Sequence, residues 1–166
     1  MILNSEIIIF DVEKNTNINN WHSTNDDVMG GVSNSIMKLD KNGYGVFTGT
    51  VSTENNGGFA MVRLPLEINL LDDSKKILLE ITGDGKPYQL RIKSDRSQKH
   101  WYIHTFQTAT KFETVEIPLE DFYPSYRGRR LILDNFSSNT IKEIAFLIGN
   151  KKNEVYKLKI KKISIN

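Results

Sequence analysis

The chain has 166 residues, with 22 Lys and Arg against 20 Asp and Glu, a net charge of +2 at pH 7. This length suits one well-buried core, so we predict a single domain over residues 1–166. A charge so close to balance gives no argument for nucleic acid or an anionic membrane as the partner. Cysteine is absent, which excludes disulfides, thiolate nucleophiles and cysteine metal ligands.

The N-terminal ten residues contain no basic region and no cleavage site of small residues. Their apolar run, residues 7–10, is too short for a signal sequence and far too short to cross a bilayer. No other stretch approaches transmembrane length. We therefore expect a soluble, cytoplasmic protein without membrane insertion.

Alternation of apolar and polar residues with period two predicts strands along most of the chain. A strand ending at Leu39 and a strand over residues 44–51 are joined by Lys41-Asn42-Gly43, a hairpin signal. The polar connection 94–99 predicts a second hairpin between strands 88–93 and 101–106. Further strands are expected over residues 59–64, 76–82, 112–117 and 144–148.

The last expected strand alternates Tyr156, Leu158 and Ile160 with lysines, which predicts one buried and one solvated face. The alternation changes phase at Lys161-Lys162, as a β-bulge would cause. Helical signals are limited to one short turn near Pro118. Many short strands with almost no helix predict an all-β sandwich or barrel.

Two segments place Asn or Asp shortly before a Gly-Gly pair at the entry to an expected strand. Their residues are Asn25, Asp26, Asp27, Gly30 and Gly31 in the first, and Asn55, Asn56, Gly57 and Gly58 in the second. They are either hydrogen-bonded entries to core strands or a polar ligand site, since Asn and Asp oxygens accept backbone N–H groups and glycines allow close approach. We predict no resident metal ion and no cofactor, while calcium at these hard oxygen ligands is the alternative.

These segments, with the residues around them, resemble the complex I intermediate-associated protein 30 family. The matching stretches follow the family's order along nearly the whole chain: Trp21, residues 25–33, Phe47-Thr48-Gly49, residues 55–60, residues 88–91, Ile117-Pro118-Leu119 with Phe122, residues 126–129 and the last strand. The resemblance implies a galactose-binding-domain-like jelly-roll sandwich. Its eukaryotic members are mitochondrial assembly factors for respiratory complex I, and photosynthetic relatives carry an added dinucleotide-binding domain, whose G-x-G-x-x-G fingerprint is absent here.

Catalysis is not expected. The three histidines, His22, His100 and His104, lack the spacing of metal ligands. Asp26 and Asp27 are adjacent, and neighbours on a strand point to opposite faces rather than toward one bond. The Gly-x-Ser-x-Gly elbow is also missing.

Carbohydrate binding is the main alternative, since sugar-binding sandwiches combine aromatic rings with Arg, Asn or Asp hydrogen bonds. The candidates are Arg91, Arg96, Trp101, Tyr102 and Phe106. One hypothesis places Tyr102, His104 and Phe106 on the same sheet face as Gln89, Arg91 and Lys93; the other turns Tyr102 and Phe106 toward the second sheet.

Nucleic acid binding would use the lysines of residues 151–162 and the arginines at 127, 129 and 130. We favour a solvated strand face, because outward lysines also prevent edge-to-edge aggregation. The overall prediction is a non-catalytic binding or assembly-factor domain. Its partner is another protein, such as a respiratory or membrane-enzyme subunit, or a small polar ligand or sugar, contacted by Asn25, Asp26, Asp27, Asn55, Asn56, Arg91 and Tyr102.

Overall fold

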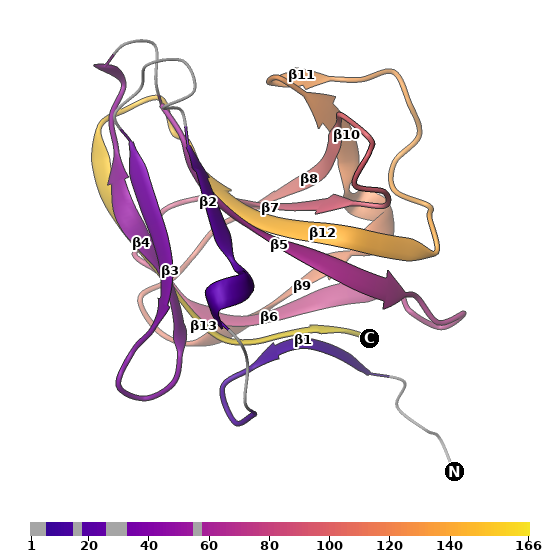
Figure 1. The fold of residues 1–166 in the computed structure, drawn as a ribbon, viewed down its shortest axis with the longest axis horizontal. Coiled ribbons are helices and arrows are strands. Elements are labelled where there is room, and N and C mark those ends of the chain that lie inside the picture. The colour runs from indigo at the N-terminus through magenta and orange to yellow at the C-terminus, as the bar shows by residue number, and fades with distance from the viewer. Residues whose placement is uncertain (1–5, 15–17, 26–32, 55–57) are drawn as a thin grey trace.

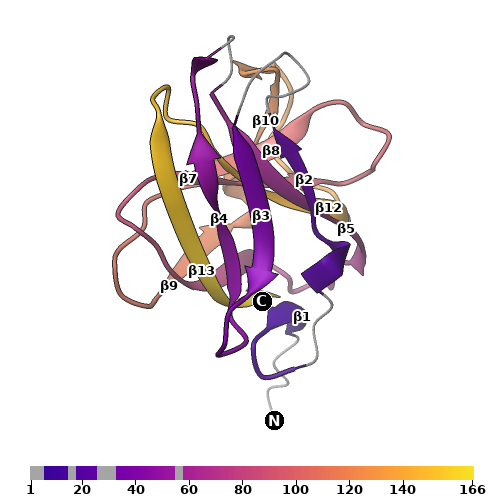
Figure 2. The same cartoon turned by 60° about the vertical axis from the view of Figure 1, so that its left-hand side comes forward.

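The protein is a sandwich of two antiparallel sheets, and its computed structural model describes residues 6–14, 18–25, 33–54 and 58–166 (Figure 1). Within these ranges the first sheet has six strands. Their order is β3 (Asn34–Leu39), β4 (Gly45–Val51), β13 (Glu154–Ile165), β6 (Lys76–Thr82) and β9 (Glu113–Pro118), and β1 (Ile7–Asp11) pairs with the C-terminal half of β13. Figure 2 shows β13, β4 and β3 side by side in this layer.

The second sheet has seven strands over the same described ranges. Their order is β11 (Arg129–Arg130), β10 (Tyr123–Tyr126), β8 (Trp101–Phe106), β7 (Tyr88–Lys93), β12 (Thr140–Ile148), β5 (Ala60–Asn69) and β2 (His22–Asn25). The described residues contain no α-helix; 3-10 turns occur at η1 (Ile18–Asn20) and η4 (Leu119–Asp121). The predicted all-β jelly-roll sandwich is confirmed.

Most expected strands form within a few residues of their predicted limits. The hairpins β3–β4 and β7–β8 are confirmed, as is the short turn after Pro118. The pairing of β13 with β6 shifts register between Ile160 and Lys162, which confirms the predicted bulge. Strands β5 and β12 are longer than predicted, and β2, β10 and β11 were not predicted because they are short and lack a clear alternation.

The core lies between the sheets and follows the period-two alternation of their central strands. The first sheet contributes buried residues such as Phe47, Leu79 and Leu158, and the second contributes Leu90 and Phe146. Leu79, Leu90 and Leu158 alternate with more exposed neighbours, as expected for strands with one buried face. Phe146 instead lies between Ala145 and Leu147, which are themselves buried on the other side of β12. Trp21 also packs into this core, where its ring stacks on Phe146 with centroids 6.0 Å apart.

Several residues in and beside the first sheet have structural roles. The carboxylate of Asp40 accepts the N–H groups of Asn42 and Tyr44 at 2.8 and 3.0 Å and closes the β3–β4 turn. At Gly49 an added Cβ would lie 2.3 Å from the carbonyl oxygen of Asn34, so only glycine allows β4 to approach β3 this closely. The lysine face of β13 is partly engaged, since Lys159 pairs with Asp40 at 3.3 Å.

Candidate binding site

The outer face of the seven-stranded sheet carries a second apolar cluster, separate from the core. It consists of Met61, Trp101, Ile103, Ala145 and Leu147, with Phe59 and Tyr123 packed against it. Strand registers place Arg63, Gln89, Arg91, Lys93 and Glu143 on this same side, because directly paired residues share a face. We call these residues together the open face.

Trp101, the first residue of β8, belongs to the open face and is only 8% exposed. The ammonium nitrogen of Lys93 is 4.6 Å from the centre of its ring, and the guanidinium carbon of Arg63 is 5.3 Å away. Arg63 belongs to β5, three strands from β8, so the indole extends across the sheet toward it. Ala145, in the intervening strand β12, is small enough to leave room for the ring. The indole is thus held under two cations rather than presented to solvent.

One of the open-face charges is neutralised inside the protein. Arg63 donates its Nε and Nη2 hydrogens to the two carboxylate oxygens of Glu143 at 2.7 and 2.8 Å. Glu143 is 5% exposed, and this bidentate pair satisfies both of its oxygens. Removing Arg63 would therefore leave the Glu143 carboxylate buried without a counter-charge.

Two further cations of the open face have no carboxylate within ion-pair distance among the described residues. Arg91 donates Nε and Nη2 to the single side-chain oxygen of Gln89 at 2.9 and 2.7 Å. Burial lowers the pKa of Arg91 from its ordinary value to about 10. Lys93 is 7% exposed, and burial also lowers its pKa, although Glu143 acts in the opposite direction. The open face keeps two partly desolvated positive charges that the described part of the chain does not balance.

The prediction that Arg91 and Tyr102 share a face is wrong. Tyr102 pairs with Ile92, so it points into the sandwich, where its ring meets Phe136 with centroids 5.3 Å apart. The alternative, in which Tyr102 and Phe106 face the other sheet, is confirmed. A hairpin loop one residue longer or shorter would exchange the two faces of β8, and the sequence does not fix that parity.

The other residues of the open face were missed or not grouped together. Trp101 was a candidate for sugar binding but not for this cluster, and Arg63, Ile103 and Glu143 were not considered. A signal was present, since Arg63 interrupts the apolar run of the expected strand 59–64 and Glu143 directly precedes the expected strand 144–148. Arg96 lies elsewhere, where it donates to the carbonyl oxygen of Leu66 at 2.9 Å.

Most of the two predicted glycine segments lies outside the described residues: Asp26, Asp27, Gly30, Gly31, Asn55, Asn56 and Gly57. Their described flanks converge, because Asn25 at the end of β2 pairs with Ala60 at the start of β5. A Cβ added at Gly149 would lie 3.0 Å from the carbonyl oxygen of Gly58, so this flank also touches the end of β12. The predicted contacts of these segments stay a hypothesis.

A pocket of about 300 Å³ lies at this end of the open face. Its walls include Gln89, Thr105, Leu147, Gly149 and Asn150. Larger hollows of about 530 and 470 Å³ lie away from it, beside Phe136 and Trp21 respectively. The open face is thus the place where an apolar floor, a pocket and unbalanced charge coincide.

The histidines and carboxylates of the described residues do not form a metal site. There, no three His, Cys, Asp or Glu side chains come together in a group that could hold a metal ion. His22 lies on β2, His100 precedes β8, and the ring of His104 packs near Phe122 with centroids 5.9 Å apart. None of the helical turns in these ranges is long and apolar enough to cross a membrane.

Comparison with solved structures identifies the fold independently. A family 11 carbohydrate-binding module from Clostridium thermocellum, in complex with a β-1,3-1,4-mixed-linked tetrasaccharide, superposes with a TM-score of 0.71 at 19% identity, over 96% of this chain and 94% of the module. The family 11 module of a cellulosomal cellulase from the same organism gives 0.72 at 18% identity, over 99% and 95%. Identities this low show a shared sandwich fold and no more.

Sequence comparison identifies the family. The mouse protein "Complex I intermediate-associated protein 30, mitochondrial" is 25% identical over an alignment of 193 positions that covers 99% of this chain and 57% of the mouse protein. The chain therefore spans little more than half the length of that relative. The family model for complex I intermediate-associated protein 30 matches residues 10–160, and the chain belongs to this family.

Proposed function

We propose that this chain is a non-catalytic binding domain that serves the assembly of a larger protein complex by holding an acidic segment of a partner on the open face. The observation that carries the proposal is the pair Arg91 and Lys93, two partly buried cations without a carboxylate partner among the described residues. The family membership supports an assembly role, because the mouse relative is named for its association with an intermediate of complex I.

Unbalanced charge at a desolvated position points to a binding role. Burying a cation without a counter-ion costs several kcal/mol unless hydrogen bonds or an opposite charge offset it. Gln89 supplies one neutral acceptor to Arg91, which leaves most of that cost in place. A carboxylate from a partner would form charge-assisted hydrogen bonds with the guanidinium and remove the cost at the moment of binding.

The cations, more than the apolar floor, suit a polypeptide. Met61, Ile103 and Leu147 are only 4–6% exposed and form a closed base, so a partner segment would bind chiefly by placing carboxylates at Arg91 and Lys93. A sugar instead needs an accessible aromatic platform. Trp101 offers little, because it is 8% exposed and covered by Lys93 and Arg63.

Carbohydrate binding is the second candidate, favoured by the Gln89–Arg91 pair beside the 300 Å³ pocket. A planar guanidinium and an amide are suitable donors and acceptors for sugar hydroxyl groups. The related sandwich of the family 11 module holds a tetrasaccharide, which makes the comparison worth a direct test.

Site-specific photo-crosslinking tests the main proposal. A photoreactive amino acid replaces Tyr123, which packs against the open-face cluster, and in a control protein it replaces Ile36 on β3 of the other sheet. We expect a discrete protein adduct in the native cells only from position 123, lost when Arg91→Met is added. Equal adducts from both positions, or an adduct indifferent to Arg91→Met, would refute it. A glycan array separates the candidates: a sugar bound in an Arg91-dependent manner, with no protein adduct, would establish the second.

A further inference from the structure

An exposed apolar projection follows strand β11. Ile132 is fully exposed and Leu133 is 56% exposed, the highest value among large apolar side chains after Ile132 and Val155. Their loop is fixed to the sheet at both ends. Leu131 donates its N–H to the carbonyl oxygen of Pro124 at 2.9 Å, and Phe136, buried in the core, donates its own to Phe122 at 2.9 Å. The protein thus displays these two side chains from an ordered backbone.

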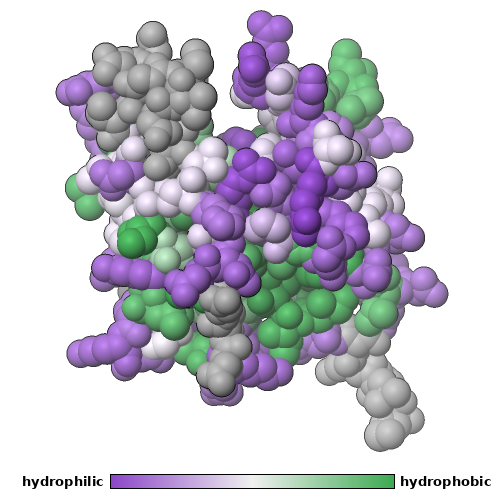
Figure 3. All heavy atoms as spheres, viewed as in Figure 1, coloured by the Kyte–Doolittle hydropathy of each residue, from purple (hydrophilic) through white to green (hydrophobic). Residues whose placement is uncertain are grey.

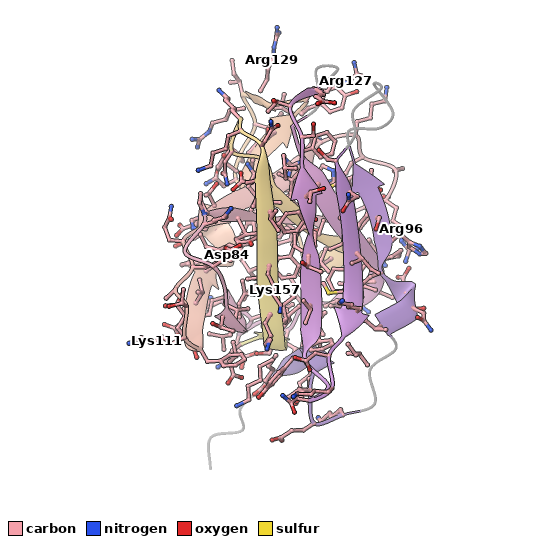
Figure 4. All side chains as sticks on the ribbon, turned by 90° about the vertical axis from the view of Figure 1, so that its left-hand side faces the viewer. Asp84, Arg96, Lys111, Arg127, Arg129 and Lys157 are labelled. Atoms are coloured by element: carbon pink, nitrogen blue, oxygen red, sulfur yellow. The ribbon has the colours of Figure 1, made fainter. Side chains whose placement is uncertain are left out.

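Three arginines accompany the projection. Arg127, with Gly128, forms the turn of the β10–β11 hairpin, where both residues have positive φ, 51° and 78°. Arg129 and Arg130 follow on β11. Among the described residues none of the three arginines forms an ion pair; Arg127 stacks on Tyr126 and Arg130 on Tyr123. Figure 4 shows Arg127 and Arg129 at the upper end of the molecule.

The arginines and the apolar side chains lie close together. Two residues separate Arg129 from Ile132, so their Cα atoms, three steps apart along the chain, are at most about 11 Å from each other. Residues 123–134 contain three arginines and one acidic residue, Asp134. Figure 3 shows hydrophobic atoms projecting at the upper right beside hydrophilic ones. We call Tyr126, Arg127, Arg129, Ile132 and Leu133 the hairpin rim.

We propose that the hairpin rim is a peripheral contact site for an anionic lipid surface. Ile132 and Leu133 enter the headgroup boundary while Arg127 and Arg129 meet lipid phosphates, and Tyr126 lies at the interface with its ring against Arg127. Apolar side chains beside cations are the combination by which proteins bind anionic bilayers without crossing them. A lipid surface fits a convex projection, whereas a protein partner would need a matching cavity for a fully exposed isoleucine.

The proposal is independent of the partner held on the open face. Arg91, Lys93 and Trp101 take no part in it, and Arg127 and Arg129 lie outside the open face. The sequence analysis found no argument for an anionic membrane in the net charge and expected no membrane insertion from the short apolar runs. Peripheral contact needs neither, because the positive charge is concentrated in one hairpin and the apolar side chains reach only the headgroup boundary without crossing the bilayer.

Vesicle co-sedimentation of the full chain tests the proposal. The probes are vesicles of phosphatidylcholine alone and vesicles of phosphatidylcholine mixed with phosphatidylglycerol. We expect binding to the mixed vesicles only, weakened by added salt. Arg127→Gln with Arg129→Gln should weaken binding about 25-fold, since each arginine near such a surface contributes about fivefold. Ile132→Ser with Leu133→Ser should weaken it about tenfold or more.

A matched control separates this site from general charge attraction. Lys111→Gln with Lys157→Gln removes the same charge from exposed residues away from the rim (Figure 4) and should change binding less than about twofold. Failure of the wild-type chain to bind mixed vesicles overturns the proposal. So does an equal loss in the lysine control, or unchanged binding in the serine variant. A wild-type dimer that the serine variant converts to a monomer, without vesicle binding, would assign the rim to self-association instead.

Discussion

Replacing Arg91 with methionine should make the protein more stable and at the same time impair partner binding. Burial lowers the pKa of the guanidinium from its ordinary value to about 10, and at 1.4 kcal/mol per pKa unit this corresponds to about 3 kcal/mol against the charged form. Loss of the hydrogen bonds to Gln89 offsets about 1 kcal/mol of that gain. Methionine fills a similar volume, so we expect the free energy of unfolding to rise by about 1–2 kcal/mol.

Thermal and urea unfolding at pH 7 measure this change. For a domain of this size the expected gain is about 2–8 °C in Tm. The matched control is Arg96→Met, which removes an arginine whose side chain is half exposed and tied to Glu67 at 3.1 Å. We expect that variant to be unchanged or slightly less stable, by at most about 1 kcal/mol.

The two measurements together separate a functional cation from a structural one. A structural arginine stabilises the fold, so its loss lowers the free energy of unfolding. If Arg91→Met destabilises the protein by more than about 1 kcal/mol, the reasoning from its burial and missing carboxylate is refuted. If it stabilises the protein and the open-face crosslink is retained, the cation is costly but serves another purpose than binding.

Three further outcomes follow from the structure. Glu143→Gln should lower the free energy of unfolding by about 2–4 kcal/mol in urea titrations, because it removes the bidentate partner of Arg63; a loss below about 0.5 kcal/mol would contradict this. Gly49→Ala should lower the free energy of unfolding by more than about 2 kcal/mol, since its Cβ would meet the carbonyl oxygen of Asn34. For a domain of this size that corresponds to a loss of about 4 °C or more in Tm, so a Tm within about 2 °C of wild type would argue against the close approach. Burial and then the charge of Asp84 raise the pKa of Tyr88, so the stability that its neutral phenol contributes is complete below about pH 10 and falls as pH rises above it. Tyr88→Phe should therefore lose about 1 kcal/mol less than wild type between pH 10 and 11, and parallel pH profiles would refute this.

Much of the fold was accessible from the sequence because period-two alternation and turn chemistry are local properties. The alternation around Tyr156, Leu158 and Ile160 predicted both β13 and its bulge, and Asn42-Gly43 predicted the β3–β4 hairpin. Each signal depends on residues a few positions apart. Such local signals are the same wherever the segment lies in the folded protein, so the sequence alone contains them.

The composition of the binding face depended on pairings between distant segments. Whether Arg91 shares its face with Tyr102 or with Trp101 and Ile103 is set by hairpin register, and a change of one residue in the loop exchanges the two. The meeting of Arg63 and Glu143, 80 positions apart, requires β5 to lie beside β12. Local alternation assigned strands and an all-β fold, while strand order and register decided which charges meet, which are left unbalanced, and which side of the sheet presents them.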